Sequence, residues 1–532
     1  MCYNNSMSNK NDSGTRTTET VTISRAEYDA DKAYISELEQ KNQWLMEQLR
    51  LIRKKQFGST SEKASEEVLE QLSLLFNEAE LYAAEVEEQK EEDAPVVEVR
   101  PHTRKKSGSV KDIVPKDIPV QVVEHRLPEE ELVCPQCGDE MTVIGKEIRE
   151  SLVFKQAEAY LRQDVYYTYA CQTCNKEDIS TPVVKTPKEP SIIPGSYASP
   201  EAVAYIAVQK FVMCAPLYRQ ELDWNRKNIM ISRQTMANWL IRCARDWFAP
   251  VYEKLHKELV TREILHSDET SIQVLHEDGK TPQSKSSMWL YRTSGDAEHP
   301  IVLYQYQPGK NSDYPKAFLK RFHGYLQTDG ASYYNSVESV THVGCWAHLR
   351  RKFEDARNVM PKGKRSPTAE QGVAYCTKLF ELEKSFKKLT PEERKKQRLE
   401  QEKPVLDAML AWANTRQAAP KSKLGMALTY LQNQWEYLNN YLLDGRIELS
   451  NNRAERSIKP FVMSRKNFLF ANTPNGAQSS AVIFSLIETA KENGLDPYRY
   501  LTWVLQTAPT LDRTQEGWAA NLLPWRAPES CK

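Results

Sequence analysis

The sequence feature that most limits the possible folds of this chain is a series of β-rich segments flanked by long helical patterns. Residues 263–345 hold the strand-like segments EILHSDETSIQVL, SMWLYRTSG and PIVLYQYQ, then the helix-like PKAFLKRF, then GYLQTDG and VTHVGCW. That order predicts a mixed sheet flanked by helices. Residues 346–445 are almost wholly helical in pattern, and further helices begin near Ser450 and Gln478. We therefore expect an α/β domain that carries a large helical insertion.

The length and the charge balance limit the remaining possibilities. The 532 residues are 40% hydrophobic, and they carry 72 basic and 72 acidic side chains. At roughly 100 to 200 residues per domain, this length predicts three or four domains. No apolar run approaches the roughly 18 to 20 residues that span a bilayer, and the first twenty residues lack the apolar region of a signal peptide. We therefore expect a cytoplasmic protein with no membrane partner.

The N-terminal region is helical and strongly charged in pattern. An a/d register runs through Tyr28, Ile35, Leu38, Leu45, Leu49 and Ile52. Asn42 falls at an a position, where a buried amide fixes register and favours two strands. This pattern predicts a coiled coil that pairs protomers, and an amphipathic helix packed on its own chain is the alternative. Residues 62–93 carry twelve acids against two lysines, whereas 101–116 carry five bases against one acid, which indicates an acidic helix and a basic linker.

Two Cys-x-x-Cys pairs, joined by β-rich sequence, form the strongest local motif. Each pair places two thiolates on one face of a tetrahedral ion, and strands can bring the second pair alongside the first. Four protein ligands leave no position for water, so the predicted zinc is structural. Buried free cysteines or a redox pair are the alternatives. The predicted ligands are Cys134, Cys137, Cys171 and Cys174.

A helical pattern over residues 199–247 predicts a three-helix unit that resembles a helix-turn-helix. Ser232 is placed to cap its last helix. The first turn of that helix then exposes Arg233, Gln234 and Thr235, where a helix-turn-helix protein presents side chains to DNA. A helical linker without a ligand is the alternative.

The predicted organisation is 1–24 disordered, 25–93 coiled coil and dimerisation, 94–117 basic linker, 118–190 zinc module, 191–250 helical DNA-binding unit, 251–475 catalytic domain with its insertion at 346–445, and 476–532 C-terminal helical region.

Three carboxylates occupy the ends of predicted elements. Asp268 follows the apolar strand EILHS, Asp329 follows GYLQT, and Glu455 lies in the first turns of a helix that begins SNNRAERSIKPF. Such carboxylates can converge on two magnesium ions about 3.5 to 4 Å apart, an arrangement that serves in-line phosphoryl displacement. Oxygen-only ligands suit Mg²⁺ or Mn²⁺ rather than zinc.

Basic side chains surround these acids and predict a polyanionic partner. One cluster lies beside Glu455, and a second follows the Cys345-x-x-His348 pair. Two residues are too few to ligate a metal alone, so His348 either donates a hydrogen bond to a phosphate or is a core histidine. Part of the first cluster serves the helix itself, since Lys459 lies four residues after Glu455. The predicted DNA contacts in the two clusters are Arg350, Arg351, Lys352, Arg453, Arg456, Arg465 and Lys466.

The motifs together resemble the insertion-sequence-66 family of bacterial transposases over residues 25–510. The resemblance rests on RKKQFGSTSEK, CPQC with CQTC, PLYRQELDW, ISRQTMANW, HSDET, LQTDG, GCWAHLRRKF and ELSNNRAERSIKPF. In that family the catalytic acids lie in DET, DG and NN-x-AER motifs, which Asp268, Asp329 and Glu455 match. The resemblance implies a ribonuclease-H-like catalytic domain of the DDE type. It also implies element-encoded accessory proteins and an association with the bacterial nucleoid.

The expected function is transposition of DNA. The chain would cleave at the terminal inverted repeats of its element and join the 3′ ends to target DNA, with two magnesium ions at the three acids. The zinc module and the helical unit would recognise the ends through phosphate and base contacts. The coiled coil would hold two ends together in a homodimer or a larger assembly. A zinc-containing DNA-binding regulator with an inert catalytic domain, or a nuclease without joining activity, are the alternatives.

Overall fold

A computed structural model describes residues 190–360 and 365–532 throughout. Before them it describes only positions 29, 32, 34, 38, 41 and 45, the stretches 159–165, 167–170 and 183–185, and residue 188. The predictions for residues 1–24, for the linker 94–117 and for the four cysteines therefore lie outside the described residues. The chain divides into two units, one of residues 1–58 with 188–532 and one of residues 59–187.

The predicted coiled coil and zinc module are described only in part. The six described positions between 29 and 45 are helical, and Leu38 and Leu45 of the a/d register are 47% and 51% exposed. In the smaller unit, strand β1 (Thr168–Ala170) pairs antiparallel with β2 (Val183–Lys185). The second cysteine pair follows β1 directly in the sequence.

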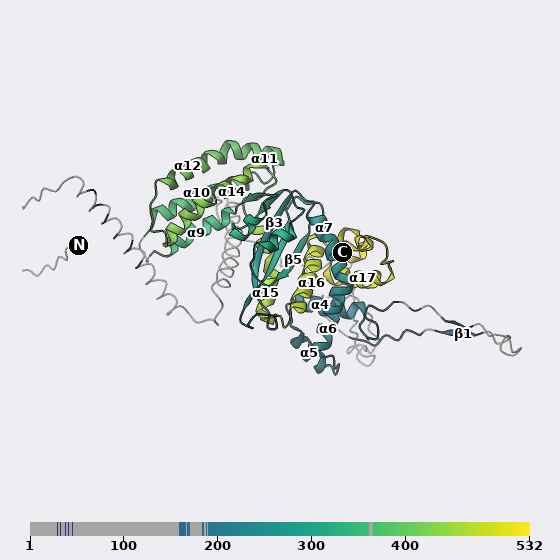
Figure 1. Cartoon of the computed structure of the whole chain (residues 1–532). Helices are drawn as coiled ribbons and strands as arrows, with labels where there is room; N and C mark the ends of the chain where they lie inside the picture. Colours follow the sequence, from purple (N-terminus) through teal and green to yellow (C-terminus); the bar gives the residue numbers. More distant parts are fainter. Residues whose placement is uncertain are drawn as a thin grey trace, which may run out of the picture. The chain divides into compact units, whose positions relative to one another are not determined.

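The larger unit is built on a five-stranded mixed sheet (Figure 1). Its strand order is β5-β4-β3-β6-β7, in which β3, β4 and β5 form an antiparallel meander while β6 and β7 run parallel to β3. The mixed sheet predicted from the sequence is therefore confirmed. The strand bounds are β3 Ile264–Gln273, β4 Lys285–Thr293, β5 Val302–Gln307, β6 Tyr325–Gln327 and β7 Thr341–Val343.

Helices cover both faces of the sheet and the free edge of β5. On one face α15 (Asn452–Phe468) packs against β3 and β4, and on the other α8 (Asp313–Phe318) stacks Phe318 on Tyr291 of β4. Helix α16 (Pro474–Glu492) runs along β5, where Ser485 and Thr489 accept hydrogen bonds from strand backbone N–H groups. These hydroxyls satisfy donors that an edge strand otherwise leaves unpaired.

The N-terminal helices of the larger unit share the core of the sheet domain. They are α4 (Pro200–Phe211), α5 (Leu217–Arg226), α6 (Arg233–Cys243) and α7 (Ala249–Leu259), with a π-helical turn η3 (Ala244–Phe248) between the last two. One hydrophobic cluster joins them to the sheet, to α16 and to α17 (Pro497–Thr507). This cluster includes residues on both sides of the boundaries expected at positions 250 and 475. Helix α16 is buried on nearly all sides, as a helix inside a core is.

The insertion is helical, as the sequence pattern predicts, and it has a core of its own. Trp346, Phe353 and Met409 are among its buried side chains, and Ile264 and Val343 of the sheet edge join the same cluster. None of the helices in the described part of the chain has the length and apolar character that a bilayer crossing requires. The insertion helices are α9 Trp346–Asn358, α10 Pro367–Ser385, α11 Pro391–Gln397, α12 Lys403–Asn414, α13 Lys423–Asn433 and α14 Trp435–Asn439.

Candidate active site

The first predicted acid, Asp268, lies in the middle of β3 on the face that α15 covers. It is half-buried and pairs across the sheet with Leu290 of β4. Side chains alternate along a strand, so His266 and Thr270 share its face. Thr270 accepts a hydrogen bond from Arg465 of α15, and His266 contacts Asn451 just before that helix. The strand thus directs Asp268 toward the start of α15.

The second acid, Asp329, follows the neighbouring strand β6 and lies in a tight turn. Its Oδ1 accepts the Ala331 N–H at 2.9 Å. Gly330 has φ +86°, a backbone conformation that favours glycine, and a Cβ there would displace the Gln434 side-chain amide. Strands β3 and β6 are adjacent and parallel, and His266 pairs with Gln327. The chain therefore passes Asp268 and Asp329 two residues later on the same side of that pair.

The third acid, Glu455, lies in the first turn of α15. Asn451 fastens that end of the helix to the sheet, since its side-chain amide donates to the Ser267 carbonyl at 2.8 Å and its backbone N–H donates to Cys345 Sγ at 3.2 Å. Asn451 is fully buried. In the sequence this asparagine is only part of the NN-x-AER motif, and its positioning contacts arise from the fold.

The structure brings the three predicted acids close enough to interact. Burial, the adjacent Glu269, Glu455 and Asp329 together raise the pKa of Asp268 well above its ordinary value. Burial is the largest cause of this rise, and the three neighbouring acids add to it because each disfavours the charged form of Asp268. Acids that lie far apart in the sequence therefore form one electrostatic cluster.

Glu269 is a fourth acid at this site that the sequence analysis missed. Its side chain lies on the opposite face of β3, where it is 6% exposed. It accepts hydrogen bonds from the Tyr333 and Tyr334 hydroxyls, and Lys310 Nζ lies 3.1 Å from its Oε1. Burial and Asp329 raise its pKa. Its place in the DET motif, next to Asp268, was the available signal.

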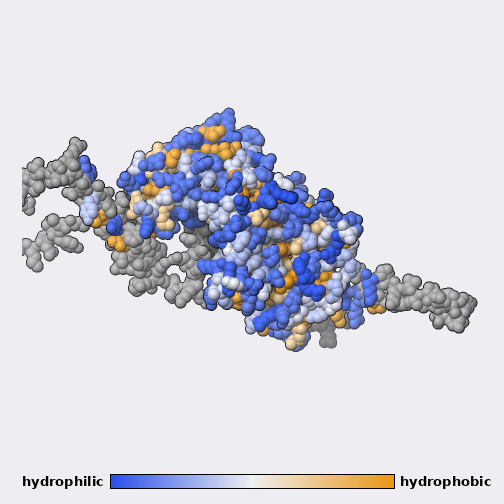
Figure 2. Space-filling model, viewed as in Figure 1, coloured by the Kyte–Doolittle hydropathy of each residue, from blue (hydrophilic) through white to orange (hydrophobic). Residues whose placement is uncertain are grey.

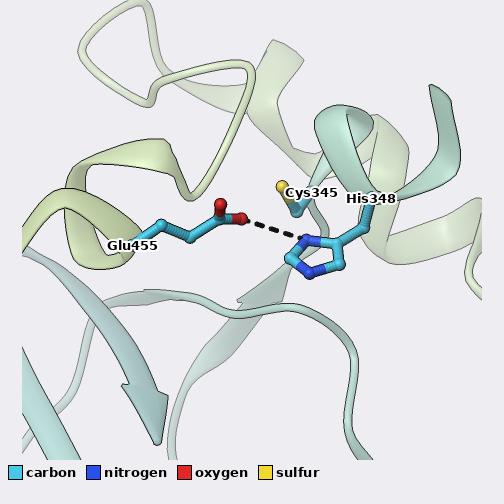
Figure 3. Close-up of side chains that lie close together, drawn as sticks. All are labelled: Cys345, His348 and Glu455. Atoms are coloured by element: carbon cyan, nitrogen blue, oxygen red, sulfur yellow. Dashed lines mark ion pairs between the residues drawn. The ribbon is translucent and has the colours of Figure 1, made fainter. Parts of the chain in front are cut away.

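Cys345, His348 and Glu455 converge at the same place (Figure 3). Their ligand atoms all lie within 4.8 Å of one another, and His348 Nδ1 is 3.5 Å from Glu455 Oε1. Burial opposes the charge of His348, but Cys345, Glu455 and Asp329 raise its pKa to about 9. The imidazole is therefore protonated at neutral pH and can donate from both nitrogens.

The basic residues predicted to bind DNA divide into several environments. Arg351 Nη2 lies 3.7 Å from Glu455, so this guanidinium is at the site. Lys352 lies over the Tyr430 ring. Arg350 pairs with Glu354 and Arg453 pairs with Glu448, both half-buried.

At the far end of α15 the expectation for Arg465 is wrong. Its side chain is 8% exposed and donates to Thr270 and Ser271 of β3, because it lies on the face of α15 that packs on the sheet. Arg465 therefore joins the helix to the strand instead of facing a nucleic acid. Arg456 and Lys466 are exposed.

In the helical unit, the predicted cap of the last helix is present. Ser232 caps α6 by accepting the Thr235 N–H at 3.1 Å. Arg233 and Gln234 are exposed on the first turn, whereas Thr235 is half-buried and hydrogen-bonded to the cap. Arg233 also lies over the Tyr218 ring of α5 and 3.9 Å from Glu221.

The acidic cluster suits hard divalent cations. Glu455 Oε1 is buried and accepts no hydrogen bond from the described residues, and the Asp268 carboxylate experiences net repulsion. Carboxylate oxygens in that state are the ligands that Mg²⁺ and Mn²⁺ prefer. The chemistry of the three acids therefore fits the expected metal, whereas the potential ligand atoms found within 4.8 Å of one another among the described residues belong to Cys345, His348 and Glu455.

Comparison with known protein families agrees with this organisation. Residues 195–479 match the Transposase IS66 family, and residues 485–525 match the IS66 C-terminal element. Residues 131–175 match the zinc-finger binding domain of transposase IS66, and residues 44–123 match the Transposase C of IS166 homeodomain. These regions define a DNA-processing enzyme with a zinc finger. The chain belongs to the IS66 family of transposases, because the first match covers more than half of it.

The matches also bear on the metal and partner predictions. The zinc-finger match contains both cysteine pairs and supports a structural zinc ion.

Two similar proteins come from Sinorhizobium fredii. The uncharacterized protein y4qI is 33% identical over 344 residues, which is 61% of this chain and 61% of that protein. The uncharacterized protein y4hP is 29% identical over 502 residues, which is 89% of this chain and 87% of that protein.

Proposed function

We propose that the chain cleaves DNA at the ends of its element and joins the 3′ ends to target DNA by a mechanism that uses two metal ions. The observation that carries this proposal is the electrostatic cluster of Asp268, Asp329 and Glu455, in which burial, Glu269 and the other two acids raise the pKa of Asp268. Membership in a transposase family supports DNA as the substrate.

A ribonuclease-H-like fold is part of the proposal. The antiparallel meander β3-β4-β5 with two parallel strands added beside β3 supports it. In that arrangement one acid lies on the first strand, the second follows the fourth, and the third comes from a helix packed on the same face. The helical insertion lies in the sequence between the second acid and the third.

Asp268, Asp329 and Glu455 would hold the ions. When bound, the ions supply Lewis-acid activation of the attacking hydroxyl and neutralise charge on the phosphate. The protein contributes the rest of the positive charge. Protonated His348 would donate an N–H to a phosphate oxygen, and Arg351 would balance the charge beside Glu455, since both contact this carboxylate.

Other basic residues, exposed or half-buried, would bind the DNA outside the reacting phosphate. Arg456, Lys466, Arg350 and Lys352 would contact its backbone, a contribution to binding that salt screens strongly. The first turn of α6, with Arg233 and Gln234, would contact the element end together with the zinc module. The coiled coil would pair two protomers, each with one end.

Labelled duplexes that carry an element end still joined to its flanking DNA, incubated with a plasmid target and Mg²⁺, test this function. The proposal predicts joined products with the native chain and none with Asp268→Asn. Binding without cleavage would favour the regulator, and cleavage without joined products would favour a simple nuclease. Equal joining by the native and D268N chains would exclude the acids as the catalytic set.

A further inference from the structure

We propose that a shallow pocket on the insertion binds an unpaired nucleobase of the DNA strand held at the acidic cluster. This inference rests on the proposed function. The pocket has a volume of about 350 Å³ and lies where α13 meets α9. Its lining includes Lys352, Pro420, Met426, Tyr430, Asn433 and Gln434.

The pocket adjoins the acidic cluster through hydrogen bonds. Tyr430 donates its hydroxyl proton to the Asp329 backbone carbonyl at 2.7 Å, and Gln434 Nε2 donates to the Gly330 carbonyl at 3.4 Å. On α9, Lys352 follows Arg351 and lies one helical turn after His348. A nucleotide whose phosphate lies at the acids therefore has this pocket beside it.

The lining offers what a nucleobase requires. Tyr430 presents a ring whose face already attracts the Lys352 ammonium, 4.9 Å from the ring centroid. A base can stack on that ring while the flexible lysine moves to the adjoining phosphate. Met426, 47% exposed, supplies an apolar surface beside it.

An unsatisfied acceptor indicates the polar part of the ligand. Gln434 Oε1 is buried against Gly330 and has no hydrogen-bond partner among the described residues, so the side-chain amide must rotate to meet a donor in the pocket. An unmet buried acceptor of this kind costs free energy unless a ligand supplies a donor. The exocyclic amino group of adenine or cytosine is such a donor, and the amide of Asn433 at the rim can contact the same base edge.

The second shallow pocket of the insertion lacks these features. It lies between α10 and α12 and is lined by Tyr375, Lys378 and Val405 among others. Among the described residues, its lining makes no hydrogen bond or ion pair with Asp329 or Gly330 and holds no buried acceptor without a partner. It therefore provides a matched control.

Photocrosslinking of the full-length chain locates the base. We would use duplexes that carry the element's own terminal sequence and a single-stranded tail, with 5-iodouracil placed at each tail position in turn, in Ca²⁺. The proposal predicts crosslinks to a peptide containing Tyr430 from one tail position. Crosslinks that appear only on other peptides would overturn it.

Abasic substitution measures the contribution of the base. Because stacking on one aromatic ring contributes about 1 to 3 kcal/mol, removal of that single base should weaken binding about 5- to 150-fold. Tyr430→Leu should weaken binding of the intact tail equally and leave the abasic tail unaffected. Tyr430→Phe should retain the difference between the two tails, and Tyr375→Leu should bind like the native chain.

The outcomes separate the two proposals. If the native chain binds the DNA end but does not distinguish intact from abasic tails, the pocket proposal is wrong and the transposase proposal stands. If the native chain binds no DNA end at all, both proposals fail. Loss of the difference in Tyr375→Leu as well as in Tyr430→Leu would also overturn the pocket proposal, because the effect would then not be specific to this pocket.

Discussion

Two buried charge clusters in the larger unit are balanced in opposite ways. In the insertion, fully buried Arg398 donates to both oxygens of Glu383 and to the carbonyls of Tyr441, Asp444 and Ile447. At the sheet, four acids gather, and burial and mutual repulsion raise the pKa of Asp268. In the insertion Arg398 thus pairs directly with Glu383, whereas Asp268 has three other acids around it, and we propose that an external cation binds there. On the face that Figure 2 shows, the surface of the insertion mixes apolar and hydrophilic side chains.

The largest expected effect comes from Asp268→Asn. Loss of one ligand should reduce DNA joining at least about 10³-fold, or roughly 4 kcal/mol in activation free energy. The same change removes repulsion, so the free energy of unfolding should stay the same or rise. Joining assays and urea unfolding on the same preparation measure both. A variant that loses activity because it unfolds would contradict the comparison.

Arg398→Met tests the charge cluster in the insertion. Removal of the buried counterion leaves Glu383 without a charged partner, so the free energy of unfolding should fall by about 3 kcal/mol or more. Arg245→Met is the control, since Arg245 pairs with Asp246 but its side chain is 70% exposed. The control should change stability by less than about 0.5 kcal/mol. Equal effects of the two substitutions would show that burial of the pair is not the cause.

Mg²⁺ should stabilise the native chain because it binds the folded acids. At a hundredfold excess over its dissociation constant, the gain is about 2.7 kcal/mol. Thermal unfolding with and without Mg²⁺ measures this gain, and Asp268→Asn should lose most of it while Arg398→Met keeps it. Equal stabilisation of the native chain and the Asp268→Asn variant would place the ion elsewhere.

Glu402 provides a smaller and pH-dependent effect. It is buried beside Glu383 in the π-helical turn η5 (Arg398–Glu402), and burial and that neighbour raise its pKa to about 8. The folded chain therefore binds this proton more tightly than the unfolded chain, so stability falls as pH rises from about 4.5 to 8. Glu402→Gln should remove that part of the fall.

The expected gain for Glu402→Gln is about 1 to 2 kcal/mol at pH 9, with none below pH 4. Urea unfolding at both pH values measures it. The exposed neighbour Glu400 gives a control, because Glu400→Gln should change neither value. A gain of the same size at acidic pH would argue against titration of Glu402 as the cause.

Pattern and motif predicted much of this arrangement. Alternation and turn signals predicted the strands that carry Asp268 and Asp329, since local preference and burial agree there. The sequence did not reveal that Arg465 faces the sheet, because a basic residue near a helix end has the same pattern whether it is buried or exposed. The contact of Tyr430 with Asp329 was not foreseen, because it depends on which segments the fold brings together, whereas Glu269 could have been identified from its place beside Asp268 in the DET motif.

Anomalous diffraction from crystals of the full-length chain soaked in Mn²⁺ tests the central claim most directly. The account predicts manganese bound by carboxylate oxygens of Asp268, Asp329 and Glu455, with the signal absent in Asp268→Asn. Manganese found only at other residues, or a cation held by Cys345 and His348 without Asp268 and Asp329, would contradict it.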